Sequence, residues 1–180
     1  MVQMYMLRSR DPYGALPMRN LLLAAAATFM FATAAMAGEV KFPADDPVAV
    51  ITIPDGWTAK EDDGALDVSS PEDSVYLGVE AADAAEAKDT MNEWAKWLVA
   101  QGVKVDDKTR KDSNGTINGM AYAAIDADGT DKEGPVSIFF AALELNKESQ
   151  VLFTYWATKD EQQKYLPAVR DMLRSVKPVE

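Results

Sequence analysis

The stretch SIFFAALEL, residues 137–145, is apolar at both odd and even positions. Successive side chains of a β-strand point to opposite faces of a sheet, so Ile138 and Phe140 lie on one face and Phe139 on the other. Residues 150–157, QVLFTYWA, also have apolar residues at both odd and even positions. A strand with two apolar faces needs cover on both of them. The two stretches therefore predict the centre of a sheet that is buried from both sides.

Two amphipathic segments can supply this cover. Residues 83–101 and 158–176 carry apolar residues at helical spacing, and Gly102 ends the first segment because glycine enters the left-handed conformation readily. The apolar stripes are Ala87, Met91, Trp94, Ala95 and Leu98 in the first helix, and Tyr165, Leu166, Val169, Met172, Leu173 and Val176 in the second. The sequence thus predicts an α+β fold, an antiparallel sheet flanked by helices on both faces.

The ends of both helices have local signals. Asp83 with Glu86, and Thr158 with Glu161, have the spacing of a capping box, in which side chains bond backbone N–H groups at a helix start. Pro167 lies inside the second helix, where it removes a backbone hydrogen bond and predicts a kink or a separate first turn.

β-Branched content and turn signals predict the other strands, at 48–53, 65–70, 75–80, 103–105 and 120–127. We expect residues 65–70 to run back beside 48–53. Between 103–105 and 120–127, Asn114-Gly115 and Asn118-Gly119 are both hairpin signals, since a type I′ turn needs positive φ at its two central residues.

A tryptophan follows the first of these strands in the stretch ITIPDGW, residues 51–57. Pro54 cannot donate to a strand ladder and so marks a strand end, while Asp55 and Gly56 supply a turn. Trp57 is then either a ligand platform or a core residue. The large apolar area of an indole favours packing in the core.

The N-terminal segment has the organisation of a secretory signal. Arg19 precedes the uncharged stretch LLLAAAATFMFATAAMA, which ends in Ala-Met-Ala at 35–37. We expect cleavage after this tripeptide, so that 1–37 is a signal peptide and 38–180 is one domain in the periplasm or secreted. Residues 1–17 form a long n-region or reflect a start codon placed too early. An uncleaved anchor is the alternative, although a spanning helix needs about 20 strongly apolar residues.

The composition excludes several chemistries, since the chain has no cysteine and no histidine. Disulfides, a lipid-attachment cysteine, thiol nucleophiles and an imidazole base are therefore absent, and no zinc or copper site is expected. No serine has a lysine three residues later, as a serine–lysine nucleophile usually requires. Paired carboxylates remain as candidate catalytic groups, but adjacency means little among so many acids, and we expect no enzyme and no catalytic residues.

The charge of the chain also restricts its partners. The formal net charge is −11, from 18 basic and 29 acidic residues. The predicted leader holds three arginines and one aspartate, so the exported part has 15 basic and 28 acidic residues and a charge of −13. Such a charge repels phosphate backbones and anionic lipid surfaces, which makes nucleic acid an unlikely partner. The acids are a solubilising coat or, alternatively, attract a basic partner or a divalent cation.

Several short motifs together resemble the PsbP/Mog1-like superfamily over about Phe42 to Pro178. They are IPDGW at 53–57, INGMAYAA at 117–124, the SIFFAALEL strand and MLRSVKP at 172–178. The resemblance implies an antiparallel sheet sandwiched by helices and a binding or accessory role. Members of the superfamily include a subunit of the oxygen-evolving complex, a Ran-binding protein and exported or lipid-anchored bacterial proteins. No Ran-contacting or photosystem-contacting motif maps onto this sequence, so neither role is carried over.

One acidic segment, DADGTDKEG at 126–134, is a candidate calcium site. Its oxygen donors are Asp126, Asp128, Asp131 and Glu133. An EF-hand needs glycine at its sixth position and glutamate at its twelfth, and this segment has Asp131 and Ser137 there. A charged hairpin loop is the alternative explanation, and no other cofactor is expected.

Three aromatic residues are candidates for partner binding. Trp97 lies at the shoulder of the apolar stripe in the first helix, Tyr76 lies in a strand, and Trp57 follows a strand. Aromatic residues are enriched at the centres of interfaces. The leading hypothesis is a non-catalytic periplasmic binding or accessory protein, whose partner is an unknown protein or a small ligand. The alternative is a carboxylate-based enzyme or calcium-dependent factor, which would need converging acids with perturbed pKa values.

Overall fold

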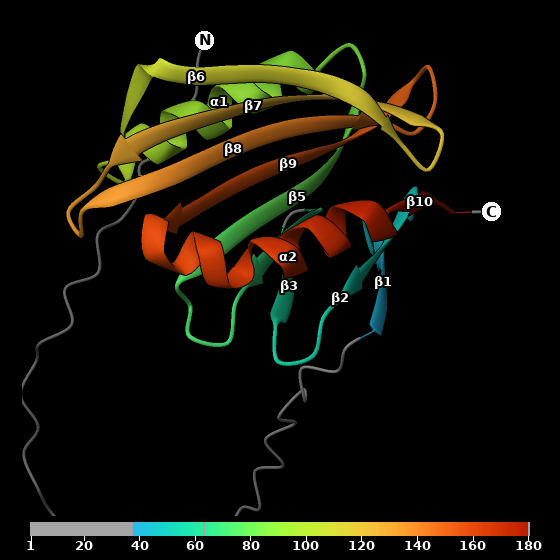
Figure 1. The fold of residues 1–180 in the computed structure, drawn as a ribbon. Coiled ribbons are helices and arrows are strands. Elements are labelled where there is room, and N and C mark those ends of the chain that lie inside the picture. The colour runs from blue at the N-terminus through green and yellow to red at the C-terminus, as the bar shows by residue number, and fades with distance from the viewer. Residues whose placement is uncertain (1–37, 63, 180) are drawn as a thin grey trace, which may run out of the picture. The chain divides into compact units, whose positions relative to one another are not determined.

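The computed structural model describes residues 38–62 and 64–179 (Figure 1). The signal peptide predicted for residues 1–37 lies outside the described residues. The strands are β1 Gly38–Phe42, β2 Ala49–Ile53, β3 Thr58–Asp62, β4 Ala65–Ser69, β5 Val75–Asp83, β6 Lys104–Ile117, β7 Met120–Thr130, β8 Pro135–Glu144, β9 Ser149–Thr158 and β10 Lys177–Pro178. The helices are α1 Ala87–Ala100 and α2 Lys159–Ser175. No helix among the described residues combines the length and the apolar character that crossing a membrane requires.

The main sheet has seven strands in the order β3-β4-β5-β9-β8-β7-β6, and every pair of neighbours is antiparallel. β9 is the middle strand, and β8 lies beside it with Phe139 opposite Tyr155. The predicted α+β class with an antiparallel sheet is therefore confirmed. β8 and β9, the two strands with apolar residues on both faces, lie at or next to its centre, where each has a neighbouring strand on both edges.

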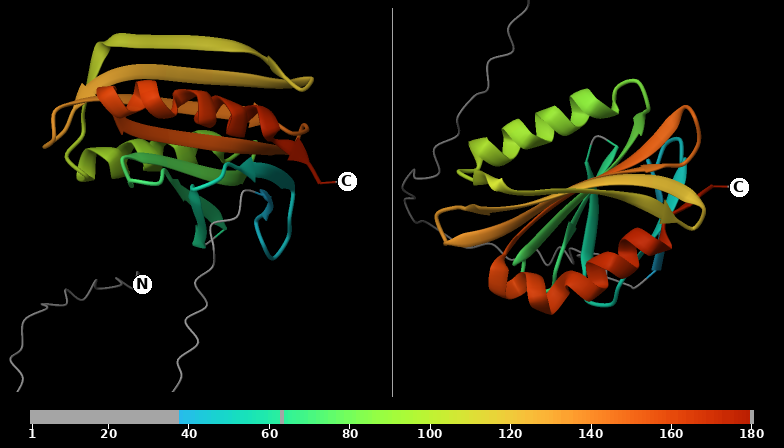
Figure 2. Two further views of the ribbon diagram at one scale, coloured as in Figure 1. Left: turned by 60° about the horizontal axis from the view of Figure 1, so that its bottom comes forward. Right: turned by 45° about the horizontal axis from the view of Figure 1, so that its top comes forward.

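The two faces of this sheet contain different hydrophobic clusters. Phe153 and Tyr155 of β9 belong to a large cluster that also includes Met172 of α2. Ile138 of β8 belongs to a smaller cluster with Leu98 of α1. Ile138 lies opposite Trp156 in the ladder, and neighbouring residues such as Tyr155 point to the other face. The two helices thus contact opposite faces, as Figure 2 shows.

A second, three-stranded sheet in the order β1-β2-β10 was not expected, and one predicted strand pairing is wrong. The strand at 65–70 does not pair with that at 48–53. Instead β4 pairs with β3 on one edge and β5 on the other, while β2 pairs with β1 and β10. The reason is the turn that follows β2, because it leads into the unpredicted strand β3, which occupies the place beside β4.

That turn confirms the packing alternative for Trp57. The Trp57 N–H donates to the Pro54 carbonyl at 3.2 Å, and Gly56 has a φ of 79°, the positive value that this kind of turn requires. The Trp57 side chain is only 3% exposed, and its ring meets Tyr165 of α2 edge-on with centroids 5.5 Å apart. Trp57 is therefore a core residue, and its prediction as a partner-binding residue is wrong.

The C-terminal end of α1 forms a Schellman motif. Gly102 has a φ of 90°, its N–H donates to the Val99 carbonyl at 3.0 Å, and the Val103 N–H donates to the Leu98 carbonyl at 3.1 Å. Val103 and Leu98 also share a hydrophobic cluster. The predicted stop at Gly102 is confirmed.

The predicted capping boxes are wrong. The N-cap of α1 is Glu86 and that of α2 is Thr158, and neither makes a side-chain capping hydrogen bond. Asp83 is the last residue of β5, where the strand ladder already determines its backbone. The Glu161 carboxylate accepts a hydrogen bond from the Ser74 hydroxyl at 3.1 Å instead of capping its own helix. α2 runs continuously from Lys159 to Ser175 with Pro167 inside, so its first turn is not separate.

Only one of the two Asn-Gly signals forms the hairpin turn. Asn118 and Gly119 connect β6 to β7 with φ values of 53° and 81°, whereas Asn114 and Gly115 lie within β6. The Asn118 side-chain amide donates to the carbonyl oxygens of Arg174 at 2.6 Å and Val176 at 3.2 Å. These bonds attach the hairpin to the end of α2 and so help to hold β6 over one side of that helix.

Candidate functional site

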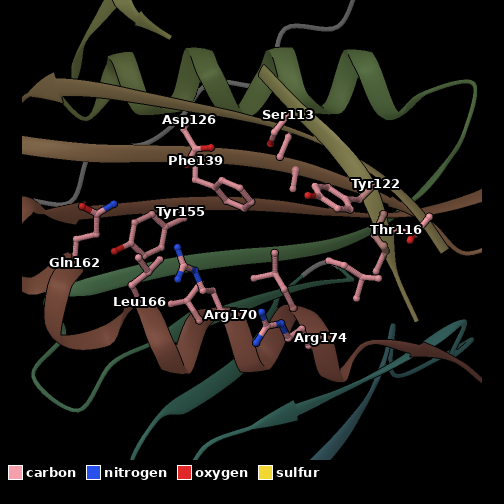
Figure 3. Close-up of a pocket in the computed structure, with 16 residues that line it drawn as sticks. Ser113, Thr116, Tyr122, Asp126, Phe139, Tyr155, Gln162, Leu166, Arg170 and Arg174 are labelled. Atoms are coloured by element: carbon pink, nitrogen blue, oxygen red, sulfur yellow. The ribbon is translucent and has the colours of Figure 1, made fainter. Parts of the chain in front are cut away.

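A cleft of about 490 Å³ lies between α2 and the face of the sheet that α2 covers (Figure 3). We call it the α2 cleft. Its walls are Ser113, Thr116 and Ile117 of β6, Tyr122, Ala124 and Asp126 of β7, Phe139, Ala141 and Leu143 of β8, Tyr155 of β9, and Gln162, Leu166, Val169, Arg170, Leu173 and Arg174 of α2. The volume is within the usual range for small-molecule sites, about 300–1,000 Å³.

α2 contributes a row of side chains to the cleft at intervals of four residues. The row consists of Gln162, Leu166, Arg170 and Arg174. Residues four apart lie above one another on a helix, so this row runs along the helix beside its buried stripe of Tyr165, Val169 and Met172. The buried stripe holds α2 against the sheet, and this row, which is polar except for Leu166, consequently faces the opening between them.

The floor of the cleft comes from alternate residues of β8 and β9. Phe139, Ala141 and Leu143 are apolar, and Tyr155 brings a phenol among them. Tyr155 is 2% exposed, and its buried hydroxyl has no hydrogen-bond partner among the described residues. Burial raises the pKa of Tyr155 above its usual range, so the phenol stays neutral and remains a hydrogen-bond donor. A buried polar group without a partner is rare and suggests that something else supplies one.

Two arginines bring positive charge to this apolar floor. Arg170 is exposed and makes no hydrogen bond or ion pair with another described residue, and Figure 3 shows its guanidinium extending from α2 toward the sheet. Arg174 has only a loose contact, 3.9 Å, with the exposed Asp171. Neither guanidinium is therefore committed to a structural ion pair, since an exposed contact of that length contributes little.

One carboxylate, Asp126, stands at the mouth of the cleft on β7. Loss of water on its inner side raises the pKa of Asp126, while the positive charges of Lys111 and Arg170 act in the opposite direction. Its side chain nevertheless remains exposed to solvent, so the rise is limited. A raised pKa means that Asp126 binds a proton at a higher pH than an ordinary carboxylate.

The four acids predicted as calcium ligands do not converge. Asp128 forms an ion pair with Lys159 at 2.7 Å, and the Asp131 carboxylate accepts hydrogen bonds from the backbone N–H groups of Glu133 and Gly134. Asp126 faces the α2 cleft. Among residues 38–62 and 64–179, no group of three or more acidic side chains is arranged to hold a metal ion. Calcium binding at this loop would need the loop to rearrange.

Gly129, the glycine of the same segment, has a packing role. An added Cβ would lie 2.7 Å from the Lys104 carbonyl oxygen and 3.0 Å from the Ile138 side chain. Gly129 pairs with Val105 in the ladder between β7 and β6. The close approach of the β6 backbone therefore explains this glycine without a metal.

The two remaining aromatic candidates lie together on the other face of the sheet. The ring centroids of Tyr76 and Trp97 are 5.2 Å apart, and Trp97 lies 6.2 Å from Trp156. Trp97 is 37% exposed, so it is accessible to a binding partner. Trp94, expected in the core, is half-buried and lines a second hollow.

Apart from Asp126, the residues of the α2 cleft were not among the sequence-based site candidates. The four-residue spacing of Gln162, Arg170 and Arg174 on either side of Leu166 is visible in the sequence and could have indicated polar side chains along one edge of the apolar stripe. The unpartnered hydroxyl of Tyr155 could not have been found, because whether a polar group has a partner depends on which side chains surround it.

Comparison with known structures identifies the fold. Cyanobacterial PsbP (CyanoP) from Synechocystis sp. PCC 6803 matches with a TM-score of 0.55 at 12% identity, over 80% of this chain and 94% of that chain. LpqN from Mycobacterium tuberculosis, described as involved in cell envelope biogenesis, matches with a TM-score of 0.52 at 11% identity, over 79% and 91%. The fold is PsbP-like.

Beyond the PsbP-like fold, the comparisons carry no residue-level assignment. A Bacteroides thetaiotaomicron protein also matches with a TM-score of 0.50 at 12% identity, and this chain spans only 45% of its length. No family model and no curated protein matches the sequence. At such low identities the likeness establishes the fold alone, and the function has to be argued from the site.

Proposed function

We propose that this PsbP-like protein is a non-catalytic, exported binding or accessory protein that takes an anionic ligand with an apolar body into the α2 cleft. The observation that carries the proposal is that the uncommitted guanidinium of Arg170 and the unpartnered hydroxyl of Tyr155 line the same cleft, together with an apolar floor. The envelope role stated for LpqN and the PsbP-like fold support an accessory protein outside the cytoplasm.

The chemistry of the cleft favours an amphipathic anion. A guanidinium offers several N–H donors in a planar fork that fits carboxylate, sulfonate and phosphate oxygens. Phe139 and Leu143 provide a surface for the apolar part of such a ligand. The Tyr155 phenol can donate a further hydrogen bond to the anionic group. These features select for a negative head group and an apolar body in the same molecule.

The alternative, a carboxylate-based enzyme, has one observation in its favour. The raised pKa of Asp126 is the kind of change that catalytic acids have. The paired-carboxylate mechanism of glycoside hydrolases needs two acids, however, and Asp126 is the only acid among the residues that line the α2 cleft. A role for Asp126 in setting which charges the cleft prefers needs no second acid.

The first test uses a charged and an uncharged probe of similar shape, 8-anilinonaphthalene-1-sulfonate and N-phenyl-1-naphthylamine. We expect Arg170→Ala to weaken binding of the sulfonate probe by about 10-fold or more, because a hydrogen bond to a charged group contributes about 1.5–3 kcal/mol. Binding of the uncharged probe should change little. Probe fluorescence measures both affinities.

Two further variants control this experiment. Lys147→Ala removes one positive charge from the exposed turn between β8 and β9, and should leave both affinities unchanged. Asp126→Asn should strengthen sulfonate binding by removing a negative charge from the cleft. As the pH falls through the raised pKa of Asp126, the wild type should gain the same advantage, because the sulfonate stays ionised. Equal sulfonate affinity in wild type, Arg170→Ala and Asp126→Asn would contradict binding in the cleft.

Export has its own test. In a Gram-negative host, we expect the protein to accumulate in the periplasm with Gly38 as its first residue. Ala37→Arg should block processing, because signal peptidase requires small residues before the cleavage site. Subcellular fractionation with N-terminal sequencing measures both results. Full-length wild-type protein retained in the cytosol would overturn this part of the proposal.

A further inference from the structure

A second hollow, of about 440 Å³, lies on the α1 side of the main sheet and has a different chemistry from the α2 cleft. We call it the α1 hollow. Its lining residues are Asp62, Ala65, Asp67, Tyr76, Trp94, Trp97 and Thr154, none of which lines the α2 cleft. Two acids and three aromatic rings are therefore present among these residues, without a lysine or arginine.

The floor of the α1 hollow is a row of paired residues across three strands. Gly78 of β5 lies opposite Asp67 of β4 on one side and opposite Thr154 of β9 on the other. Gly78 leaves room for the ring of Tyr76, because an added Cβ would lie 3.1 Å from the Tyr76 hydroxyl. That hydroxyl donates to the Asp67 carboxylate at 2.7 Å. The sheet thus holds a carboxylate and an aromatic ring at one end of the row.

The aromatic rings are held in place and remain partly open to solvent. Trp97 is inclined at 38° to Tyr76 and meets Trp156 nearly edge-on, at 80°. Its exposed fraction of 37% is large for a tryptophan that makes two ring contacts. A cation is attracted to the negative face of an aromatic ring, and tryptophan is the strongest partner. Fixed, accessible rings beside carboxylates are typical of sites for organic cations.

Thr154 provides an independent sign of a ligand. It is 1% exposed, it lines the α1 hollow, and its hydroxyl has no hydrogen-bond partner among the described residues. Buried hydroxyl groups nearly always have a partner. A ligand with its own hydroxyl or N–H group would supply the missing partner at this position.

We propose that the α1 hollow binds an alkylammonium group of the quaternary or methylated amine class. Tyr76, Trp94 and Trp97 provide ring faces for the methyl groups, and Asp62 and Asp67 balance the positive charge. Thr154 pairs with a polar group on the same ligand. The inorganic cations of the medium do not compete well for such a site, because they have no apolar surface to place against the rings.

Calorimetric titration with choline and its neutral isostere, 3,3-dimethyl-1-butanol, tests the proposal. We expect choline to bind to the purified protein with a dissociation constant of about 1 mM or lower, and the isostere at least about 10-fold more weakly. Asp67→Asn and Trp97→Ala should each weaken choline binding by about 10-fold, whereas Trp97→Phe should weaken it less. Asp45→Asn removes an exposed acid of the β1–β2 connection and should have no effect.

The outcomes separate charge from apolar contact. Equal binding of choline and the isostere, an unchanged affinity in Asp67→Asn, or no choline binding at about 20 mM, well above that affinity, would each overturn the proposal. Circular dichroism of every variant identifies any that fails to fold. If Trp97→Ala fails to fold, Trp97→Phe and Asp67→Asn provide the test. Sedimentation with dioleoylphosphatidylcholine vesicles distinguishes the source of the ammonium group. Choline-sensitive sedimentation indicates a lipid head group, and its absence indicates a free molecule.

Discussion

Replacing Trp57 with alanine is expected to lower the free energy of unfolding by about 3–5 kcal/mol, the range measured for large aromatic residues in protein cores. The side chain is 3% exposed and contacts Tyr165 of α2 edge-on. Its loss leaves a cavity at the point where the turn after β2 meets α2. Urea unfolding followed by circular dichroism measures the change.

Trp57→Phe is the matched variant, because it keeps an aromatic ring in the site. It should cost less than Trp57→Ala, since part of the apolar volume and the edge-on contact remain. A change of less than about 1 kcal/mol in Trp57→Ala would show that the indole is not packed as described, since surface substitutions have effects of that size.

The second large effect concerns the two helices and tests whether they pack in separate clusters. Leu98→Ala on α1 and Met172→Ala on α2 should each lower the free energy of unfolding by about 2–5 kcal/mol. Leu98 is 1% exposed and Met172 is fully buried. The residues belong to different hydrophobic clusters, so their losses should add to within about 0.5 kcal/mol in the double variant.

Val99→Ala is the control for the α1 variant. Val99 adjoins Leu98 in sequence but is 62% exposed, so its truncation should change the free energy by no more than about 0.5 kcal/mol. A double variant of Leu98 and Met172 that loses much less than the sum would contradict the separation of the clusters. Chemical denaturation at several protein concentrations measures all four variants and excludes association as a cause.

The sequence was most informative where a local pattern and a local conformation correspond directly. The nearly continuous apolar run in residues 137–145 predicted β8, because a short apolar run bounded by turn signals is typical of a strand buried on both faces. Gly102 predicted the end of α1, since the left-handed φ it adopts is costly for other residues. The Asn-Gly pair at 118–119 was a correct turn signal for the same reason.

Prediction failed where the partner of a group determines its role. The capping boxes that begin at Asp83 and Thr158 have the correct spacing but do not form. The ladder of β5 determines the backbone at Asp83, and the Glu161 carboxylate accepts a hydrogen bond from Ser74 instead of capping its own helix. The strand at 65–70 was assigned to the wrong neighbour, because β3 has the polar sequence TAKED and gives no periodic signal. Pairing between strands is a property of the whole chain, so a weak strand can change it.

Among the candidate sites, too, the sequence was informative about single residues and not about which residues come together. Trp97 and Tyr76 were chosen as exposed aromatic residues, and the structure places their rings 5.2 Å apart beside Asp67. The acids at 126–134 were grouped because they are adjacent in sequence, and the fold separates them into a cleft residue, an ion pair and a turn. Acids that are close together along a strand do not converge on one point, since the strand backbone is extended and cannot wrap around an ion.

By itself the sequence determined which segments are strands or helices at the core, and that the central strands have apolar residues on both faces. These properties follow from side-chain periodicity and backbone sterics, which act within a few residues. The tertiary structure alone decided that β2 belongs to a second sheet, that Arg170 and the unpartnered hydroxyl of Tyr155 line one cleft, and that Thr154 lines one hollow with three aromatic rings. Each of these depends on contacts between distant segments, because hydrogen-bond satisfaction and burial exist only once the chain has folded.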